Sequence, residues 1–328
     1  MNLTTFYNDV YILTSSSCAS KDEGEGPFGK FIDFLYHDPK AHQKSFEDGE
    51  QEMIDKAINL SLMKATMSNC DIDLFIGGDL LDQLSSSNQT MKDKGVSFLG
   101  VYGACSTFIL ALIVGSIFID SKKAQNVLCF SSSNYGGAER QFRYPLNYGI
   151  KKKETTTITA SGAASIILTS FKKEIRIVSS TLGSVEDPSW DDYSDLGNAM
   201  AYGAFKTICA HLKNSNKNVS DYDLIVSGDL SSYGANTLKK MLLEVGIELV
   251  NFMDSGNYIY NDEAKYFAGG SGAACIGICL SSYIIKKMIS REIKNVLIIG
   301  TGALHSKCSV AQKKSVPVIA HAIELERV

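Results

Sequence analysis

The feature that most constrains the fold is an internal repeat. The segment DIDLFIGGDL at residues 71–80 returns as DYDLIVSGDL at residues 221–230, with six of ten positions identical. Further along, NVLCFSSS at 126–133 matches NVLIIGTG at 295–302. Internal similarity of this kind indicates that one structural unit occurs twice in the chain.

Each copy combines a helix-like stretch with short strands. EQEMIDKAINLSLMKATM precedes the first copy and NAMAYGAFKTICAHLKN the second, and each motif is a β-rich run that ends in Gly-Asp. Helices that alternate with apolar strands predict an α/β fold in which helices flank mixed sheets. We expect two duplicated halves, residues 1–172 and 173–328, with about 19 additional residues in the second half at 250–266.

Both halves contain a long uncharged segment. No charged residue occurs from Gly95 to Ile119, which is long enough to cross a bilayer. The second half has an equivalent segment, GGSGAACIGICLSSYII, and glycine and serine interrupt both. Helices buried on all sides of a large core have this composition too. We therefore expect two central helices that pack against each other rather than a membrane span.

The overall composition excludes several classes of protein. The net charge of −4 gives no basic footprint for nucleic acid. The eight cysteines form no CxxC motif and no cysteine–histidine pattern at zinc spacing, and the chain is too long for a disulfide scaffold. The N-terminus lacks the basic and continuous apolar regions of a signal peptide. We expect a cytoplasmic protein with reduced cysteines, no metal site and no cofactor.

Motifs along nearly the whole chain resemble one family. They are EGPFG (25–29), GGDLLDQ (77–83), YGACST (102–107), AERQFRYP (138–145), FAGGSG (267–272), GTGAL (300–304) and IAH…ER (319–327). The chain resembles the stage V sporulation protein AD family, thiolase-like proteins of spore-forming bacteria. AERQFRYP is the most specific of these signals, because GACST alone indicates only the thiolase superfamily.

The resemblance implies a fold, a ligand and partners. The fold would be a thiolase-like five-layered αβαβα sandwich, often a homodimer. The family's ligand would be pyridine-2,6-dicarboxylate (dipicolinate), free or as its calcium chelate, which it helps to move into the forespore. The partners would be the other proteins of the stage V sporulation membrane channel, and the protein would lie peripheral to the spore inner membrane through them.

Cys105 is the candidate nucleophile. It opens the first uncharged segment, and a helix N-terminus favours the thiolate. The superfamily's assisting residues are missing, since FAGGSG holds neither histidine nor asparagine and LIIGTGAL has isoleucine where a second cysteine would fall. An oxyanion site could survive through the N–H groups of Cys105 and of a Gly300–Gly302 loop. His305 is either a substitute base or, more simply, a solvated loop residue.

An arginine-containing loop could hold a dicarboxylate. Arg140 and Arg143, two of only five arginines, alternate with Phe142 and Tyr144, which supplies fork-shaped donors beside aromatic walls. Arg140 has the simpler alternative of pairing with Glu139 or another nearby carboxylate. Asn134 ends the preceding strand, where it is either a ligand contact or a turn residue.

Three aspartates complete the candidates. Asp79 and Asp229 end the two Gly-Asp strands, and we expect a shared role as helix caps, with Asp79 also a weak ligand contact. Asp254 lies in the additional segment and is expected to be a solvated loop acid. No acidic loop has calcium-site spacing, so any calcium would arrive with the ligand.

These observations favour a non-enzymatic, dipicolinate-binding protein with Cys105, Arg140, Arg143, Tyr144, Asn134, Asp79, Gly302 and His305 at its site. Two alternatives stay open. One is an acyl-transferring enzyme of the thiolase or ketoacyl-synthase type that uses Cys105. The other is a pure scaffold of the spore membrane channel with a vestigial pocket.

Overall fold

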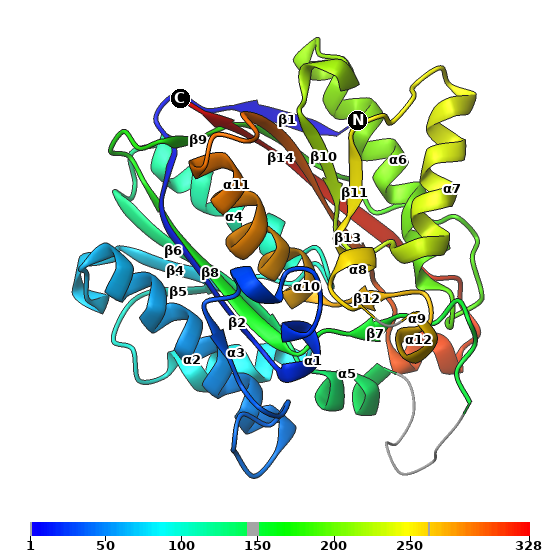
Figure 1. Ribbon diagram of the computed structural model, residues 1–328, viewed down its shortest axis with the longest axis horizontal. Helices are drawn as coiled ribbons and strands as arrows, with labels where there is room; N and C mark the ends of the chain where they lie inside the picture. The colour runs from blue at the N-terminus through cyan, green and yellow to red at the C-terminus, as the bar shows by residue number, and fades with distance from the viewer. Residues whose placement is uncertain (1, 143–150, 262) are drawn as a thin grey trace.

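The chain folds into five alternating layers of helices and sheets. The computed structural model describes residues 2–142, 151–261 and 263–328. Two sheets enclose a central layer of helices, and each sheet carries further helices on its outer face (Figure 1). The predicted αβαβα sandwich is therefore confirmed.

The two sheets have the same strand order. The first is β2 (Tyr11–Ala19), β8 (Gly162–Thr169), β6 (Asn126–Ser133), β4 (Leu74–Gly78) and β5 (Phe98–Gly100). The second is β9 (Ile175–Leu182), β14 (Val318–Arg327), β13 (Asn295–Ala303), β10 (Leu224–Ser227) and β11 (Phe252–Asp254). In each, the first two pairings are antiparallel and the last two parallel. The duplication inferred from the sequence is thus a duplication of topology.

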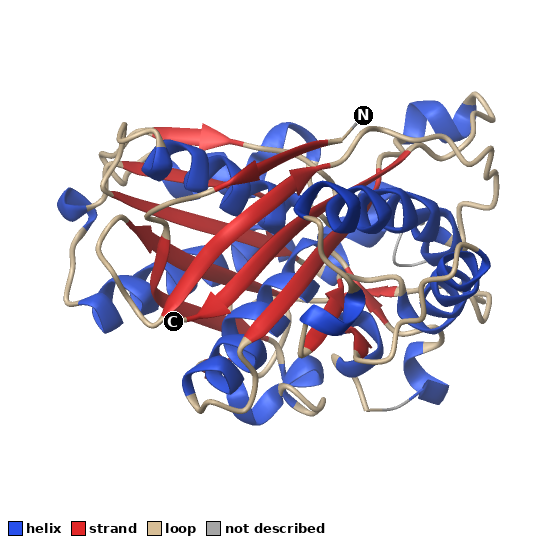
Figure 2. Ribbon diagram, turned by 90° about the horizontal axis from the view of Figure 1, so that it is seen from above, coloured by secondary structure: helices blue, strands red, loops and turns tan. Residues whose placement is uncertain are grey.

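The sheets meet along a very short seam. Strands β2 and β9 pair through only two residue pairs, Tyr11 with Arg176 and Ile12 with Ile175. Beyond this seam the sheets diverge, and the long strands can be followed between the helices that cover them (Figure 2). The boundary predicted at residues 172 and 173 lies in the link between β8 and β9.

The repeated aspartates of the DxDL motif have the same role in both halves. Asp71 and Asp221 each close a capping box with the residue three positions earlier. Asp73 accepts N–H bonds of 2.7 and 3.0 Å from the start of β6, and Asp223 accepts N–H bonds of 2.7 and 2.9 Å from the start of β13. The aspartates of each motif therefore fix the start of one strand, β6 in the first half and β13 in the second, and its register with the neighbouring strand.

The central layer contains the uncharged segments. It consists of α4 (Thr107–Asp120) and of a second helix formed by α10 (Ala273–Ile278), a π-helical turn (Cys279–Ile284) and α11 (Ile285–Ile289). Helix α4 contacts strands of both sheets, so most of its residues are buried. Within the described residues, no helix is long and apolar enough to cross a membrane. Burial between two sheets accounts for the missing charges.

The outer layers are amphipathic helices. Helices α2 (Phe46–Ala65) and α3 (Ser85–Met91) cover the first sheet, and α6 (Leu196–Ser215) and α7 (Ser231–Glu244) cover the second (Figure 1). The N-cap side chains Ser45 and Asp195 accept from backbone N–H groups in the first turns of α2 and α6. This satisfies donors that would otherwise be unpaired at the helix ends.

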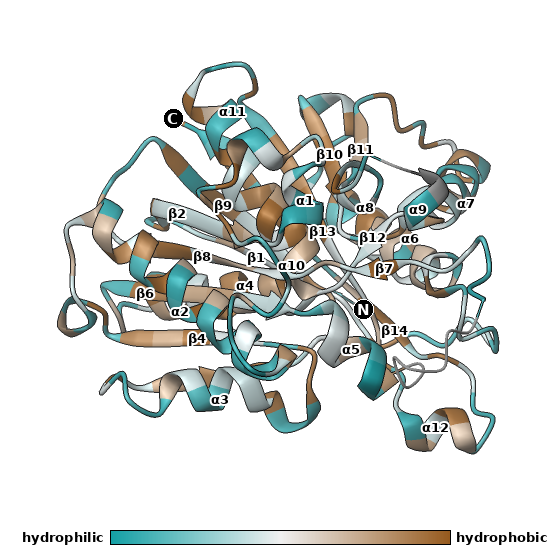
Figure 3. Ribbon diagram, turned by 60° about the horizontal axis from the view of Figure 1, so that its bottom comes forward, coloured by the Kyte–Doolittle hydropathy of each residue, from teal (hydrophilic) through white to brown (hydrophobic). Residues whose placement is uncertain are grey.

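Short elements complete the fold. They are β1 (Leu3–Phe6), β3 (Phe34–Leu35), β7 (Ile158–Thr159), β12 (Gly270–Ser271), α1 (Lys21–Gly24), α5 (Tyr135–Phe142), α8 (Ser255–Tyr258), α9 (Glu263–Tyr266) and α12 (Lys307–Ala311). Strand β1 pairs with β9 and β3 with β2, and most of the others lie near the N-terminal ends of the central helices (Figure 1). Strands β7 and β12 pair in parallel as a separate two-stranded sheet. Helix α5 contacts β7 of this small sheet, and Figure 3 shows that β4, β6 and β10 are mostly hydrophobic.

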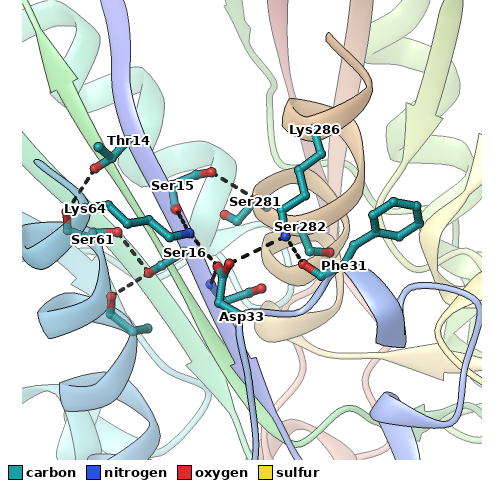
Figure 4. A network of polar contacts seen from close by, with 12 residues as sticks. Thr14, Ser15, Ser16, Phe31, Asp33, Ser61, Lys64, Ser281, Ser282 and Lys286 are labelled. Carbon is teal, nitrogen blue, oxygen red and sulfur yellow. Dashed lines mark hydrogen bonds and ion pairs between the residues drawn. The ribbon is translucent and has the colours of Figure 1, made fainter. Parts of the chain in front are cut away.

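A polar network joins three layers beside β2 (Figure 4). Asp33 forms ion pairs with Lys64 of the outer helix α2, at 2.8 Å, and with Lys286 of the central helix α11, at 3.5 Å. Lys64 also donates to the carbonyl of Ser15 at 2.7 Å, and the Ser15 hydroxyl donates to the carbonyl of Ser281 at 3.0 Å. These contacts fix the outer and central helices to the same strand.

Candidate functional site

Cys105 lies in a tight turn directly before α4. The Ser106 hydroxyl donates to the Gly103 carbonyl at 2.6 Å. The Thr107 hydroxyl accepts from the Gly103 N–H at 3.0 Å and donates to the Ala104 carbonyl at 2.6 Å. Ala104 has a φ of +51°, in the left-handed region that non-glycine residues rarely adopt. These side-chain bonds hold Ala104 in a conformation that its backbone alone does not favour, and so fix the turn that carries Cys105.

Strand β13 packs directly against this turn. A Cβ atom added to Gly302 would lie 2.3 Å from the Gly103 carbonyl oxygen, so only glycine permits the approach. Residues 300–302 belong to β13 and pair with β14, so the expectation of a glycine loop there was wrong. Gly302 supports the cysteine turn from behind.

A narrow pocket of about 50 Å³ opens beside Cys105. It is lined by Leu80, Tyr102, Ala104, Cys105, Ala138, Phe142, Thr157, Thr159, Leu196, Met200, Asp229, Ser271, Gly272, Ala303 and His305. A wider groove of about 440 Å³ shares four of these residues, Leu80, Tyr102, Phe142 and His305, and includes Lys307 of α12. Residues from both halves thus form one site, with a groove beside it that leads outward.

The walls of the pocket are mostly apolar, with a few aromatic and polar side chains among them. The rings of Phe142 and His305 are 5.5 Å apart, and Tyr193 lies 6.4 Å from the same histidine. His305 is 8% exposed, so the expectation of a solvated loop histidine was wrong. The hydroxyls of Thr159 and Ser271 line the pocket, and among the described residues neither makes a side-chain hydrogen bond. Two hydroxyls are therefore available to a ligand.

The surroundings of Cys105 oppose formation of a thiolate. Burial raises the pKa of the Cys105 thiol well above its ordinary value, and the charge and hydrogen bonding of Asp229 raise it further. A hydrogen bond from the Gly272 N–H lowers the pKa of the thiol, but by less than burial and Asp229 raise it. The prediction that the helix N-terminus would favour the thiolate was wrong, because a buried carboxyl faces the sulfur.

The two Gly-Asp motifs end in aspartates with different roles. Asp79 accepts from the N–H of Leu81 at 2.8 Å and from the N–H and hydroxyl of Ser87 at 2.7 and 2.6 Å, so it stabilises the start of α3. It does not line the pocket. Asp229 does, and accepts from the Thr301 hydroxyl at 2.7 Å and the Gly272 N–H at 3.0 Å. The expectation of a shared capping role was therefore wrong.

Asp254 takes over the capping role in the second half. Its carboxylate accepts from the N–H groups of Leu230 and Ser231, at 3.0 and 2.8 Å, at the start of α7. Its exposed fraction is 1%, so the expectation of a solvated loop acid was wrong. Burial raises the pKa of Asp254 to about 7 despite a hydrogen bond from Ser227, and the charge of Asp229 raises it as well.

Sequence reasoning missed a second buried carboxyl pair. Burial raises the pKa of Glu50 in α2 well above its usual range, and so does the neighbouring charge of Asp79. Glu50 accepts from the hydroxyls of Ser132 at 2.8 Å and Ser86 at 3.3 Å. A glutamate on a helix face gives no sequence signal of such burial.

Like Asp79 and Gly302, the predicted ligand contacts Arg140 and Asn134 do not line the pocket. Arg140 forms an ion pair with Glu47 of α2, and its Nε donates to the Gly136 carbonyl at 3.3 Å. Asn134 donates to the Pro39 carbonyl at 2.6 Å and accepts from the Gly136 N–H at 3.0 Å, which makes it a turn residue before α5.

Two further predicted contacts, Arg143 and Tyr144, lie outside the described residues. They directly follow Phe142, which lines the pocket. In the described part of the chain, no group of three or more histidine, cysteine, aspartate or glutamate side chains is arranged to hold a metal ion.

Comparisons of the sequence with known proteins point to one family. A family model described as stage V sporulation protein AD matches residues 2–326. Stage V sporulation protein AD of Bacillus subtilis is 36% identical over 98% of this chain and 96% of its own length.

Similar solved structures show the fold. One is 3-oxoacyl-[acyl-carrier-protein] synthase III from Aquifex aeolicus, with a TM-score of 0.61 and 16% identity over 97% of this chain and 99% of that one. Another is OleA from Xanthomonas campestris with bound lauric acid and lauroyl-CoA, with a TM-score of 0.61 and 14% identity over 97% of this chain and 99% of that one. The fold is therefore thiolase-like.

Proposed function

Because the chain belongs to the stage V sporulation protein AD family and so has a role in sporulation, we propose that it binds dipicolinate beside Cys105 and serves dipicolinate transport into the forespore. The observation that carries the proposal is the pocket at Cys105. There the cysteine that would be the nucleophile of a thiolase-type enzyme faces Asp229, whose carboxyl opposes formation of the thiolate. Such a pocket suits reversible binding better than nucleophilic attack.

The chemistry of the walls suits a flat aromatic acid. Tyr102 and Phe142 offer apolar ring faces, against which the pyridine ring would pack. The hydroxyls of Thr159 and Ser271 can donate to a carboxylate. Since the inner pocket is narrow, the ligand would extend into the adjoining groove, where Lys307 supplies a cation.

Arg143 is the proposed fork-shaped donor. It follows Phe142 by one residue, whereas Arg140 is committed to an ion pair with Glu47. Arginine binds a carboxylate through two parallel N–H bonds, so its loss should weaken binding of a dicarboxylate more than binding of a monocarboxylate. Arg140→Ala is the matched control, because it removes the same charge from the same segment outside the pocket.

Calorimetric titration with dipicolinate tests the proposal. We expect saturable one-site binding, lost in Arg143→Ala, weakened in Cys105→Ala and Thr159→Val, and nearly unchanged in Arg140→Ala. At 100 times its dissociation constant the ligand should also stabilise the fold by about 2.7 kcal/mol. Titrations with and without calcium show whether the protein binds free dipicolinate or its calcium chelate. Absence of binding up to millimolar dipicolinate in both would overturn the proposal.

Acyl transfer is the second candidate, favoured by the presence of Cys105 and His305 in one pocket. A histidine near a cysteine can act as its base. Incubation with an acyl-CoA followed by mass spectrometry separates the two functions. A mass increase on Cys105 that disappears in Cys105→Ser would establish the enzyme, and an unmodified Cys105 agrees with the binding function.

We further propose that other proteins of the stage V sporulation channel bring the protein to the spore inner membrane, and that it forms a homodimer. Pull-down with those channel proteins, repeated for Arg143→Ala, tests the first point, and sedimentation tests the second. Partner capture by a protein that binds no dipicolinate would instead identify a scaffold.

A further inference from the structure

Asp229 places a buried carboxyl in the pocket proposed for an anion. It follows β10, has an exposed fraction of 1% and lines the pocket with Cys105. The Thr301 hydroxyl on β13 donates to one carboxylate oxygen at 2.7 Å, and the Gly272 N–H before α10 donates to the other at 3.0 Å. These two donors fix the carboxyl at the pocket wall.

The groups around Asp229 supply little positive charge. The thiol of Cys105 faces it from the turn before α4, and the thiol of Cys275 lies near it in α10. Asp254 at the end of β11 adds a second carboxyl, and His305 lines the same pocket. No lysine or arginine among the described residues lines the inner pocket. Consistent with this, burial raises the pKa of Asp229 to about 6.

An anionic ligand would meet this carboxyl at short range. Two negative charges a few ångströms apart in a water-poor site repel each other strongly, and a proton on one of them removes the repulsion. The protonated carboxyl can still accept from Thr301 and Gly272 and can donate its own hydrogen to the ligand. Protonation therefore converts Asp229 from a group that repels the ligand's carboxylate into a hydrogen-bond donor to it.

We infer that binding of a carboxylate ligand beside Cys105 is coupled to the uptake of one proton from solvent by Asp229. The inference rests on the proposed binding function and adds the residue that links it to pH. Affinity should weaken by up to about tenfold per pH unit above pH 6, over a range in which the ligand itself stays a dianion.

Calorimetry in buffers of different ionisation enthalpy measures the proton directly. At pH 7.5 we expect close to one proton taken up per dipicolinate bound by the unmodified protein. Asp229→Asn should bind without uptake and with little pH dependence. Asp254→Asn, which removes the neighbouring carboxyl outside the pocket lining, and His305→Gln should both retain the uptake.

Several outcomes overturn the inference. They are binding by the unmodified protein without proton uptake, full uptake in Asp229→Asn, or loss of uptake in His305→Gln, which would assign the proton to the histidine. The uncharged analogue pyridine-2,6-dimethanol provides a readout that needs no variant, since it should bind without uptake. Failure of dipicolinate to bind at any pH would instead refute the proposed function.

Discussion

Gly302→Ala should show how tightly the cysteine turn depends on β13. The new Cβ atom would lie 2.3 Å from the Gly103 carbonyl oxygen, and ordinary contacts begin at 3.4 Å. The two backbones must therefore separate by about 1.1 Å. Because both sides of the contact are backbone, we expect a cost of about 3 kcal/mol, at the upper end for overpacking. The displaced turn should also move Cys105 and weaken dipicolinate binding, as is expected for Cys105→Ala.

Urea unfolding followed by circular dichroism measures this cost. Gly203→Ala in α6 is the matched control, since its added Cβ meets nothing closer than 3.4 Å. Alanine is the better helix former, so the control should be neutral or more stable by up to about 1 kcal/mol. A free energy of unfolding for Gly302→Ala within about 0.5 kcal/mol of the unmodified protein would refute the packing described here.

Three further predictions concern the buried polar groups. Iodoacetamide at neutral pH should modify Cys105 far more slowly than the exposed Cys308, because burial and Asp229 raise the pKa of the Cys105 thiol. Because the pKa of Asp254 is raised to about 7 in the folded protein, its protonation stabilises the fold fully below about pH 4, and this stabilisation is lost as the pH rises to about 7. The unfolding free energy of Asp254→Asn should therefore fall less between pH 5 and 8 than that of the unmodified protein. Asp33→Asn should cost about 1–2 kcal/mol in unfolding free energy, because two lysines lose their shared partner.

Each of these predictions has a result that contradicts it. Equal alkylation rates for the two cysteines, determined by peptide mass spectrometry, would show that the Cys105 thiol is not suppressed. An unchanged pH dependence of the unfolding free energy in Asp254→Asn would assign that dependence to other groups. A loss below about 0.3 kcal/mol in Asp33→Asn would reduce the network of Figure 4 to an ordinary surface ion pair.

The sequence predicted the architecture well because the repeat reflects local structure. The DxDL aspartates bond to backbone at equivalent positions in both halves, Asp71 and Asp221 locally and Asp73 and Asp223 to the neighbouring strand. The uncharged segments likewise reflect a position between two sheets. Hydrogen bonds that are repeated in both halves, and burial on all sides, leave a pattern that a single sequence contains.

The site was harder to predict because long-range packing decides it. Asp79 and Asp229 end the same motif, yet only Asp229 faces Cys105. In the second half Asp254, rather than Asp229, accepts the N–H bonds at the start of the helix that follows, α7. The partner of Arg140 is Glu47, distant in sequence and therefore invisible to local reasoning. The burial of His305 depends on Phe142 and Tyr193, which come from separate segments.

The most direct test of the central claim is a crystal structure of the protein with dipicolinate. We expect the pyridine ring to contact Cys105 and to lie between the side chains of Tyr102 and Phe142, with one carboxylate within hydrogen-bonding distance of Asp229. Dipicolinate bound anywhere else on the molecule, with the pocket beside Cys105 empty, would contradict the claim.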